Sequence, residues 1–218
     1  MTLSSTLAIC KASPLNLLAE FSPDRHQMPL HLSKKAIRAL GIAESFRPGD
    51  RKSTLAGVVM RSDLLVDGFV FGTATVGGED ATASVLRVCR RLRREDVNII
   101  MLSGCIISRY NIVDVDQVAE RTGLPVICLT YKESKGIEGT IKGRFDRPDT
   151  RIEAYRKLRS RKPVLLHTGY KAFVRCAGIE YADAKRVLDS FTLQGVVPEP
   201  VRLARLLAHA RRAGTRRP

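Results

Sequence analysis

Two continuous apolar runs constrain the fold of this chain more than any other feature of its sequence. They are VNIIMLSG at residues 97–104 and GLPVICLTY at residues 123–131. A strand with one face in water alternates apolar and polar residues, whereas a strand that is covered on both faces is apolar throughout. Both runs are therefore predicted to be strands of a sheet that has helices packed on its faces.

Three further strands are predicted before these runs, at residues 36–44, 54–61 and 64–76. Polar breaks such as RPGDRKS separate them, and links this short favour an antiparallel meander. The two apolar runs have the composition of parallel strands. We therefore expect residues 97–103 and 125–130 to lie parallel to the first strand, within the same mixed sheet.

Helices are predicted at residues 80–94, where apolar residues recur on one stripe, and near residues 114–122. The resulting order, β-β-β-α-β-α-β, is that of ribonuclease H-like folds, although other mixed α/β folds begin in the same way. Downstream, KPVLLHTG and FVRCAGI predict two late strands. A helix at residues 181–190 and a final helix in VPEPVRLARLLAHA are expected to follow them.

The charge balance predicts an anionic partner. The chain has 37 Lys and Arg residues against 22 Asp and Glu residues, a formal net charge of +15, and its arginines concentrate in RVCRRLRRED and ARRAGTRRP. Lys and Arg release counterions when they bind a polyphosphate. Nucleic acid is the predicted partner, with DNA favoured over RNA, although the charge can also serve solubility alone.

The sequence also indicates a class of protein and a domain plan. No apolar run approaches the roughly 20 residues of a membrane span, so we expect a cytoplasmic protein without a membrane partner. The five cysteines form no CxxC pair, and we interpret them as buried thiols rather than disulfides or zinc ligands. Residues 1–33 are predicted to be a poorly ordered extension, residues 34–212 a single domain, and residues 213–218 a basic tail.

Several motifs carry a resemblance to a known family over roughly residues 34–212. In order, they are LGIAESF, LAGVVMRSDLLVDGFVFG, TVGGEDAT, IIMLSGCIISRYNIVDV, TGLPVICLTY and VPEPVRLARLLAHA. They resemble the archaeal endonuclease dU family, formerly a domain of unknown function, which is related to endonuclease V. The resemblance implies a ribonuclease H-like fold and a metal-dependent endonuclease, a hydrolase of DNA repair that acts on damaged or deaminated DNA of the deoxyuridine or deoxyinosine type, or on structured nucleic acid.

The ribonuclease H-like plan implies where acids would hold metal. Two-metal nucleases bind Mg²⁺ or Mn²⁺ with carboxylates from different strands. The plan points to Glu44 at the end of the first strand and to Asp80 at the start of the first helix. The end of the fourth strand carries Ser103, a poor ligand, so Asp114 is expected to fold back and substitute. Glu44, Asp80 and Asp114 are the candidate catalytic residues and metal ligands.

Each of these acids also has a purely structural interpretation. Glu44 can be a loop acid, Asp80 the N-cap of the first helix, and Asp114 the cap of the next helix. Asp67 precedes Gly68 between apolar stretches, which is typical of a hairpin turn. His167 and His209 are more often satisfied surface or core residues than general bases.

Six polar residues are candidates for contacts with nucleic acid. They are Arg90, Arg94, Asn111, Lys132, Lys135 and Arg202. The arginines can instead belong to solvated helix faces, and Asn111 can brace its own loop. The final helix can serve only as a docking helix, or its Glu199 can pair with a core arginine such as Arg175.

Two functions remain open from the sequence. The first is a metal-dependent endonuclease, and the second is a non-catalytic nucleic-acid-binding protein that retains the fold with a degenerate metal site. The convergence of Glu44, Asp80 and Asp114 would favour the first function. Ser103 at the expected position of an acid favours the second.

Overall fold

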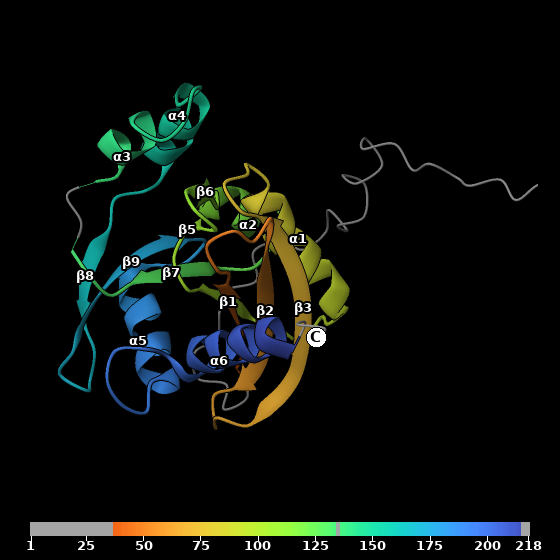
Figure 1. The fold of residues 1–218 in the computed structure, drawn as a ribbon. Coiled ribbons are helices and arrows are strands. Elements are labelled where there is room, and N and C mark those ends of the chain that lie inside the picture. Colours follow the sequence, from red (N-terminus) through yellow and green to blue (C-terminus); the bar gives the residue numbers. More distant parts are fainter. Residues whose placement is uncertain (1–36, 134–135, 215–218) are drawn as a thin grey trace, which may run out of the picture.

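The computed structural model describes residues 37–133 and 136–214, which contain a sheet with helices on both faces (Figure 1). The sheet has seven strands in the order β3-β2-β1-β4-β7-β9-β8. Its strands are β1 (Arg38–Ser45), β2 (Lys52–Arg61), β3 (Val66–Thr75), β4 (Ile99–Leu102), β7 (Val126–Thr130), β8 (Lys162–Leu165) and β9 (Lys171–Ala177). A separate hairpin consists of β5 (Ile106–Ile107) and β6 (Asn111–Ile112).

The helices complete the order of elements. They are α1 (Ala81–Leu92), α2 (Val115–Thr122), α3 (Glu138–Lys142), α4 (Asp149–Lys157), α5 (Tyr181–Phe191) and α6 (Glu199–Gly214). The sequence does not predict α3 and α4, which lie above the β5–β6 hairpin and α2 in Figure 1. No helix within the described residues combines the length and the apolar character that crossing a membrane requires.

The predicted strand directions are confirmed. β1, β2 and β3 form an antiparallel meander, and β4 and β7 run parallel to β1. β9 then pairs antiparallel with β7, and β8 pairs antiparallel with β9. The predicted extension at residues 1–33 lies outside the described residues, and α6 continues to Gly214, past the predicted end of the domain.

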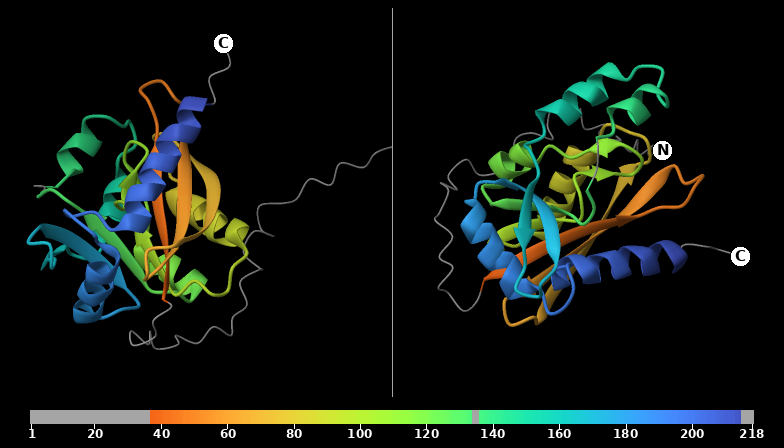
Figure 2. Two further views of the ribbon diagram at one scale, coloured as in Figure 1. Left: turned by 90° about the horizontal axis from the view of Figure 1, so that it is seen from below. Right: turned by 90° about the vertical axis from the view of Figure 1, so that its left-hand side faces the viewer.

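Each face of the sheet is covered by its own helices (Figure 2). Alternate residues of β1 serve the two faces, with Leu40 and Ile42 in the cluster of α1 and α2, and Ala39 in the cluster of α5 and α6. At Gly41, a Cβ atom would stand 2.3 Å from the carbonyl carbon of Pro200. Glycine at this position therefore lets the start of α6 pack directly on β1.

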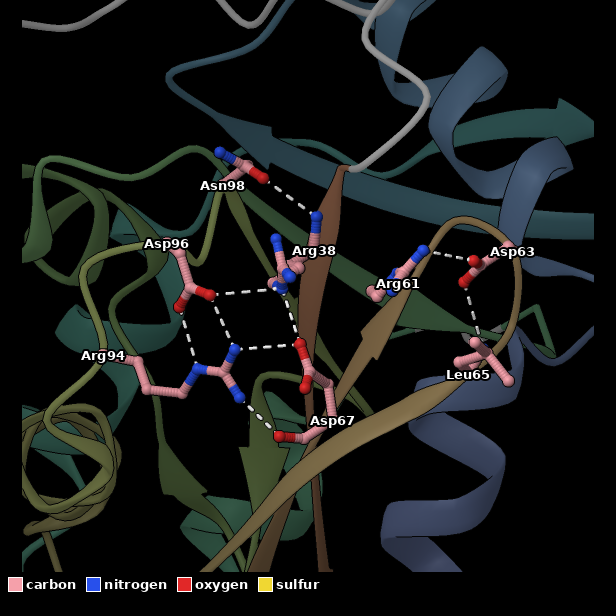
Figure 3. A network of polar contacts seen from close by, with 8 residues as sticks. All are labelled: Arg38, Arg61, Asp63, Leu65, Asp67, Arg94, Asp96 and Asn98. Carbon is pink, nitrogen blue, oxygen red and sulfur yellow. Dashed lines mark hydrogen bonds and ion pairs between the residues drawn. The ribbon is translucent and has the colours of Figure 1, made fainter.

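A network of ion pairs stabilises the end of the sheet at which β1 begins (Figure 3). Asp67 Oδ2 accepts hydrogen bonds from Arg38 Nε at 2.6 Å and from Arg94 Nη2 at 2.9 Å, and Arg94 also binds Asp96 at 2.6 Å. The hydrogen bond from Arg38, and then that from Arg94, hold the pKa of Asp67 below its ordinary value. The network ties the meander to the link between α1 and β4.

One prediction needs correction at this end of the sheet. Asp67 lies within β3 and not in a hairpin turn, because the turn between β2 and β3 comes earlier, where Leu64 has a positive φ of 68°. Arg94, a predicted nucleic-acid contact, forms ion pairs with Asp67 and Asp96. Arg94 and Glu44 lie at opposite ends of the strands, because Arg94 contacts the network around Arg38, which begins β1, and Glu44 lies near the end of β1.

The four described cysteines, Cys89, Cys105, Cys128 and Cys176, are free and buried or half-buried, which agrees with the interpretation as buried thiols. Burial raises the pKa of Cys89 to about 12. Cys10 lies outside the described residues.

Candidate active site at the carboxyl ends of the parallel strands

Glu44 is held at the rim of the sheet by the β5–β6 hairpin. Its Oε1 accepts a hydrogen bond from the backbone N–H of Ser108, and its Oε2 accepts one from the Ser108 hydroxyl, both at 2.8 Å. The Ser108 hydroxyl also lies 2.5 Å from the hydroxyl of Ser53 on β2. The half-buried carboxylate of Glu44 is therefore fixed in position, with hydrogen bonds on both oxygens.

The turn that presents these donors has an uncommon backbone. Ser108, Arg109 and Tyr110 have φ values of 44°, 62° and 63°, so three consecutive residues other than glycine are left-handed. Each such residue costs on the order of 1–3 kcal/mol and persists only where its surroundings impose it. Here the bonds to Glu44 and a 2.6 Å hydrogen bond from Gly77 N–H to the Ser108 carbonyl impose it. Strain of this kind is concentrated at functional sites.

Asp80 precedes α1, but its side chain does not cap that helix. Its Oδ1 accepts from Thr75 N–H at 3.0 Å and from Asn111 Nδ2 at 2.8 Å, and its Oδ2 accepts from the Thr75 hydroxyl at 2.9 Å. Burial raises the pKa of Asp80, but the hydrogen bonds from Thr75 and Asn111 outweigh it and lower the pKa. The cap is supplied by Asn111, whose Oδ1 accepts from Ala81 N–H at 2.8 Å. Asp80 therefore occupies the predicted N-cap position, but its side chain makes no capping hydrogen bond.

Asp114 has the structural role that was its alternative. Its Oδ1 accepts from the N–H groups of Asp116 and Gln117, each at 3.0 Å, and so caps α2. Residues 37–133 and 136–214 contain no group of three His, Cys, Asp or Glu side chains that could hold a metal ion. The predicted set of Glu44, Asp80 and Asp114 is thus not brought together as one centre.

Ser103, directly after β4, is hydrogen-bonded to an arginine side chain. Its hydroxyl accepts a 2.8 Å hydrogen bond from Arg205 Nε of α6, and the Arg205 guanidinium lies 4.6 Å from the centre of the Tyr131 ring. Glu44 and Asp80 both lie at this rim, and carboxylates with water and phosphate oxygens can hold one Mg²⁺. Ser103 supplies no carboxylate and Asp114 caps α2, so the described residues do not bring together the three acids that a two-metal centre would use.

Arg151 is a functional residue that the sequence analysis missed. From α4, its guanidinium donates to the carbonyls of Gly77 at 2.7 Å, Gly78 at 2.6 Å and Tyr110 at 3.3 Å, and it stacks 4.1 Å from the centre of the Phe145 ring. These bonds hold the turn before Asp80 against the hairpin. No local pattern distinguishes Arg151 from its neighbouring arginines, because its partners are distant in the sequence.

A basic and aromatic hollow of about 370 Å³ opens beside this turn. Arg51, Arg109 and Arg144 line it together with Tyr110 and Phe145. The two rings meet edge to face at 6.1 Å, and the Arg144 guanidinium lies 6.0 Å from the centre of the Tyr110 ring. Cations that follow a phosphate backbone, together with rings on which bases stack, are typical of surfaces that bind single-stranded nucleic acid.

Other predicted contacts with nucleic acid lie elsewhere. Arg202 pairs with the buried Glu199 through bonds of 2.6–2.9 Å. Arg175 is not the partner of Glu199, since it donates to the Arg159 carbonyl and to Cys105 Sγ. The pairing of Glu199 with a core arginine is therefore wrong.

The remaining predicted residues are placed as follows. Arg90 lies in the last turn of α1, Lys132 is exposed after β7, and Lys135 lies outside the described residues. His167 lies 3.5 Å from Asp189, and His209 lies 3.0 Å from Arg212, so both have structural partners.

Comparison with known proteins identifies the family of this chain. The family model described as Endonuclease dU matches residues 35–211. The chain belongs to the endonuclease dU family. One relative, the UPF0215 protein of Pyrobaculum calidifontis, is 43% identical to this chain over 170 residues. The matched segment covers 78% of this chain and 93% of that protein. Family membership supports a nuclease-like role in nucleic-acid processing.

Solved structures show the fold of this endonuclease dU family member. A protein of unknown function from Archaeoglobus fulgidus is similar over 80% of this chain and 97% of that chain, with a TM-score of 0.69 and 26% identity. Endonuclease V of Ciona intestinalis, in complex with a 24mer DNA containing an inosine followed by a ribo-adenosine, is similar over 84% of this chain and 88% of that chain, with a TM-score of 0.57 and 10% identity. The fold is ribonuclease H-like, as the sequence predicts.

Proposed function

We propose that this protein is a metal-dependent endonuclease that acts on deaminated or damaged DNA at the rim formed by Glu44 and Asp80. The observation that carries this proposal is the β5–β6 hairpin, which holds one acid through Ser108 and the other through Asn111. The acids come from the end of a strand and the start of a helix. Endonuclease V of Ciona intestinalis, with the same fold, is bound to DNA that contains inosine, which supports deaminated DNA as the substrate class.

Different residues at this rim would bind the metal ion, bind the nucleic acid and position the turn that carries Asp80. Glu44 and Asp80 would hold one Mg²⁺ or Mn²⁺, which supplies charge stabilisation at the phosphodiester when it is bound. Arg51, Arg109 and Arg144 would hold the phosphate backbone of a DNA strand, and the half-buried ring of Tyr110 would support a base. The Arg151 bonds would keep the turn that carries Asp80 in place.

A second candidate function is favoured by two observations. The side chain at the end of β4 is Ser103, and Arg205 rather than a carboxylate lies beside it. Both oxygens of Glu44 and of Asp80 already accept hydrogen bonds from the protein. These features suit a protein that binds nucleic acid at the same rim without cleaving it.

One experiment separates the two functions. The wild type, Glu44→Gln and Asp80→Asn are incubated with deoxyuridine-, deoxyinosine- and RNA-containing strands, with and without Mg²⁺ or Mn²⁺, and binding is measured in parallel by fluorescence anisotropy. We expect metal-dependent cleavage of a deaminated strand by the wild type, and losses of at least about 100-fold in both variants, comparable to removal of one preorganised electrostatic group. Binding should remain within a few-fold of wild type.

The matched control is Asp183→Asn, which changes an exposed acid of α5 that pairs with Arg186. It should cleave as the wild type does, and thermal melting verifies that each variant is folded. Binding that weakens with salt but without cleavage by the wild type would favour the second function. Absence of binding by the wild type at low salt would reject both.

A further inference from the structure

Among the residues that the structure describes, the guanidinium of Arg205 has no acidic partner. Its Nε donates a 2.8 Å hydrogen bond to the Ser103 hydroxyl, and its central carbon lies over the Tyr131 ring, 4.6 Å from the ring centre. Two other arginines of the last two helices pair with acids: Arg202 with Glu199, and Arg186 with Asp183. Within residues 37–133 and 136–214, Arg205 has neither an ion pair nor a hydrogen-bond acceptor for its two terminal nitrogens.

Arg205 is held at the carboxyl ends of the parallel strands, which is where ligands of open α/β folds bind. Ser103 directly follows β4, and Tyr131 directly follows β7, so both mark the carboxyl ends of parallel strands. Binding sites of open α/β sheets lie outside these ends. The helix that carries Arg205 is rigidly seated, because Ala204 is buried against Ala43 of β1.

Ser103 and Tyr131 orient the guanidinium and leave its terminal fork available. Two parallel N–H groups of an arginine match two oxygens of a phosphate, and a guanidinium stacked on an aromatic ring is already ordered for that contact. The Tyr131 hydroxyl is a second polar group there that is buried without a partner among the described residues. A buried polar group without a partner requires a water molecule, an ion or a ligand to account for it.

We propose that Arg205 binds a backbone phosphate of the nucleic acid at the end of β4, with Ser103 and Tyr131 as its positioning residues. A protein cation thereby occupies the place where the ribonuclease H-like plan puts an acid and its metal ion. The inference rests on the proposed binding of nucleic acid at this rim, but it does not require cleavage. The net charge of +15 favours a polyphosphate over the carboxylate of a protein partner.

The test measures the affinity of the full chain for a fluorescein-labelled single-stranded 20-mer DNA between about 50 and 200 mM NaCl. Arg205→Met keeps an apolar stem on Tyr131 but removes the charge. We expect an affinity loss of roughly 10-fold at low salt, as for the loss of one charge-assisted hydrogen bond. The slope of log K against log salt should become less negative by about 0.7, the value for one phosphate on a single strand.

Two further variants separate charge from orientation. Ser103→Ala keeps the cation but removes its acceptor, so we expect a smaller loss of affinity with an unchanged slope. Arg186→Met, which removes a mostly exposed cation from α5, is the matched control and should change neither quantity. Thermal melting confirms folding in each case.

The outcomes distinguish this inference from the proposed function. Wild-type binding that weakens with salt, together with an unchanged slope in Arg205→Met, overturns the role of Arg205 and leaves the proposed function intact. Equal slope changes in Arg205→Met and Arg186→Met also overturn it, because any surface cation would then act alike. Absence of wild-type binding removes both proposals.

Discussion

Arg151→Met tests whether one side chain fastens α4 to the candidate site. Arg151 is buried, and its two short hydrogen bonds to the Gly77 and Gly78 carbonyls are charge-assisted. Such bonds contribute about 1.5–3 kcal/mol each. Water can replace part of this at the rim, so we take the lower value for each bond and expect a loss of about 3 kcal/mol. That loss corresponds to a roughly 150-fold increase in the opening of α4, because about 1.4 kcal/mol is a factor of ten.

Native-state hydrogen exchange measures this opening directly. The main contacts of α4 outside α3 are with β6, so its amides should lose protection by that factor in Arg151→Met, whereas the amides of β1 and β4 should be almost unchanged. Arg156→Met on the same helix is the control, since Arg156 forms an exposed pair with Glu138 that contributes little. Unchanged protection of α4 in Arg151→Met, or an equal loss in Arg156→Met, would refute the reasoning.

Two further outcomes follow from the packing and the charges. Gly41→Ala should lower the unfolding free energy by about 3 kcal/mol or more and lower the melting temperature measured by circular dichroism, because the new Cβ would meet the Pro200 backbone at 2.3 Å; an unchanged melting temperature would contradict that close approach. The pKa of Asp80 is lowered in the folded state, so the stability that its ionised form adds is complete above its unfolded pKa of about 3.9 and is lost as the pH falls through the folded pKa. The difference in unfolding free energy between wild type and Asp80→Asn, measured with denaturant, should therefore be constant from about pH 5 to 8 and shrink below about pH 4; a difference that grows on acidification would show the opposite shift.

Local patterns were sufficient for most of the sheet. The continuous apolar runs became β4 and β7 with every residue of β4 buried, and the short polar links produced the meander. These features depend on residues that are neighbours in the sequence or that repeat along one strand. The same reasoning placed Glu44 near the end of β1 and Asp80 before α1, because the end of a strand and the start of a helix are local signals.

The polar contacts of the site could not be read in the same way. The sequence makes Asp80 the natural cap of α1, yet Asn111 takes that role from a position 30 residues away and frees Asp80 to bind Thr75. The helices α3 and α4 are short, with little apolar periodicity, so the sequence predicts no helix between β7 and β8.

The sequence alone determined the class of fold and the order and direction of the central strands, since hydrophobic periodicity acts along the chain, and the family resemblance pointed to the positions of Glu44 and Asp80. Only the tertiary structure decided what surrounds those acids. Arg205 reaches Ser103 across 102 residues, and Arg151 reaches Gly77 across 74. Such contacts depend on where a helix packs on the sheet. The residues between the two partners do not show a local pattern that predicts this packing position.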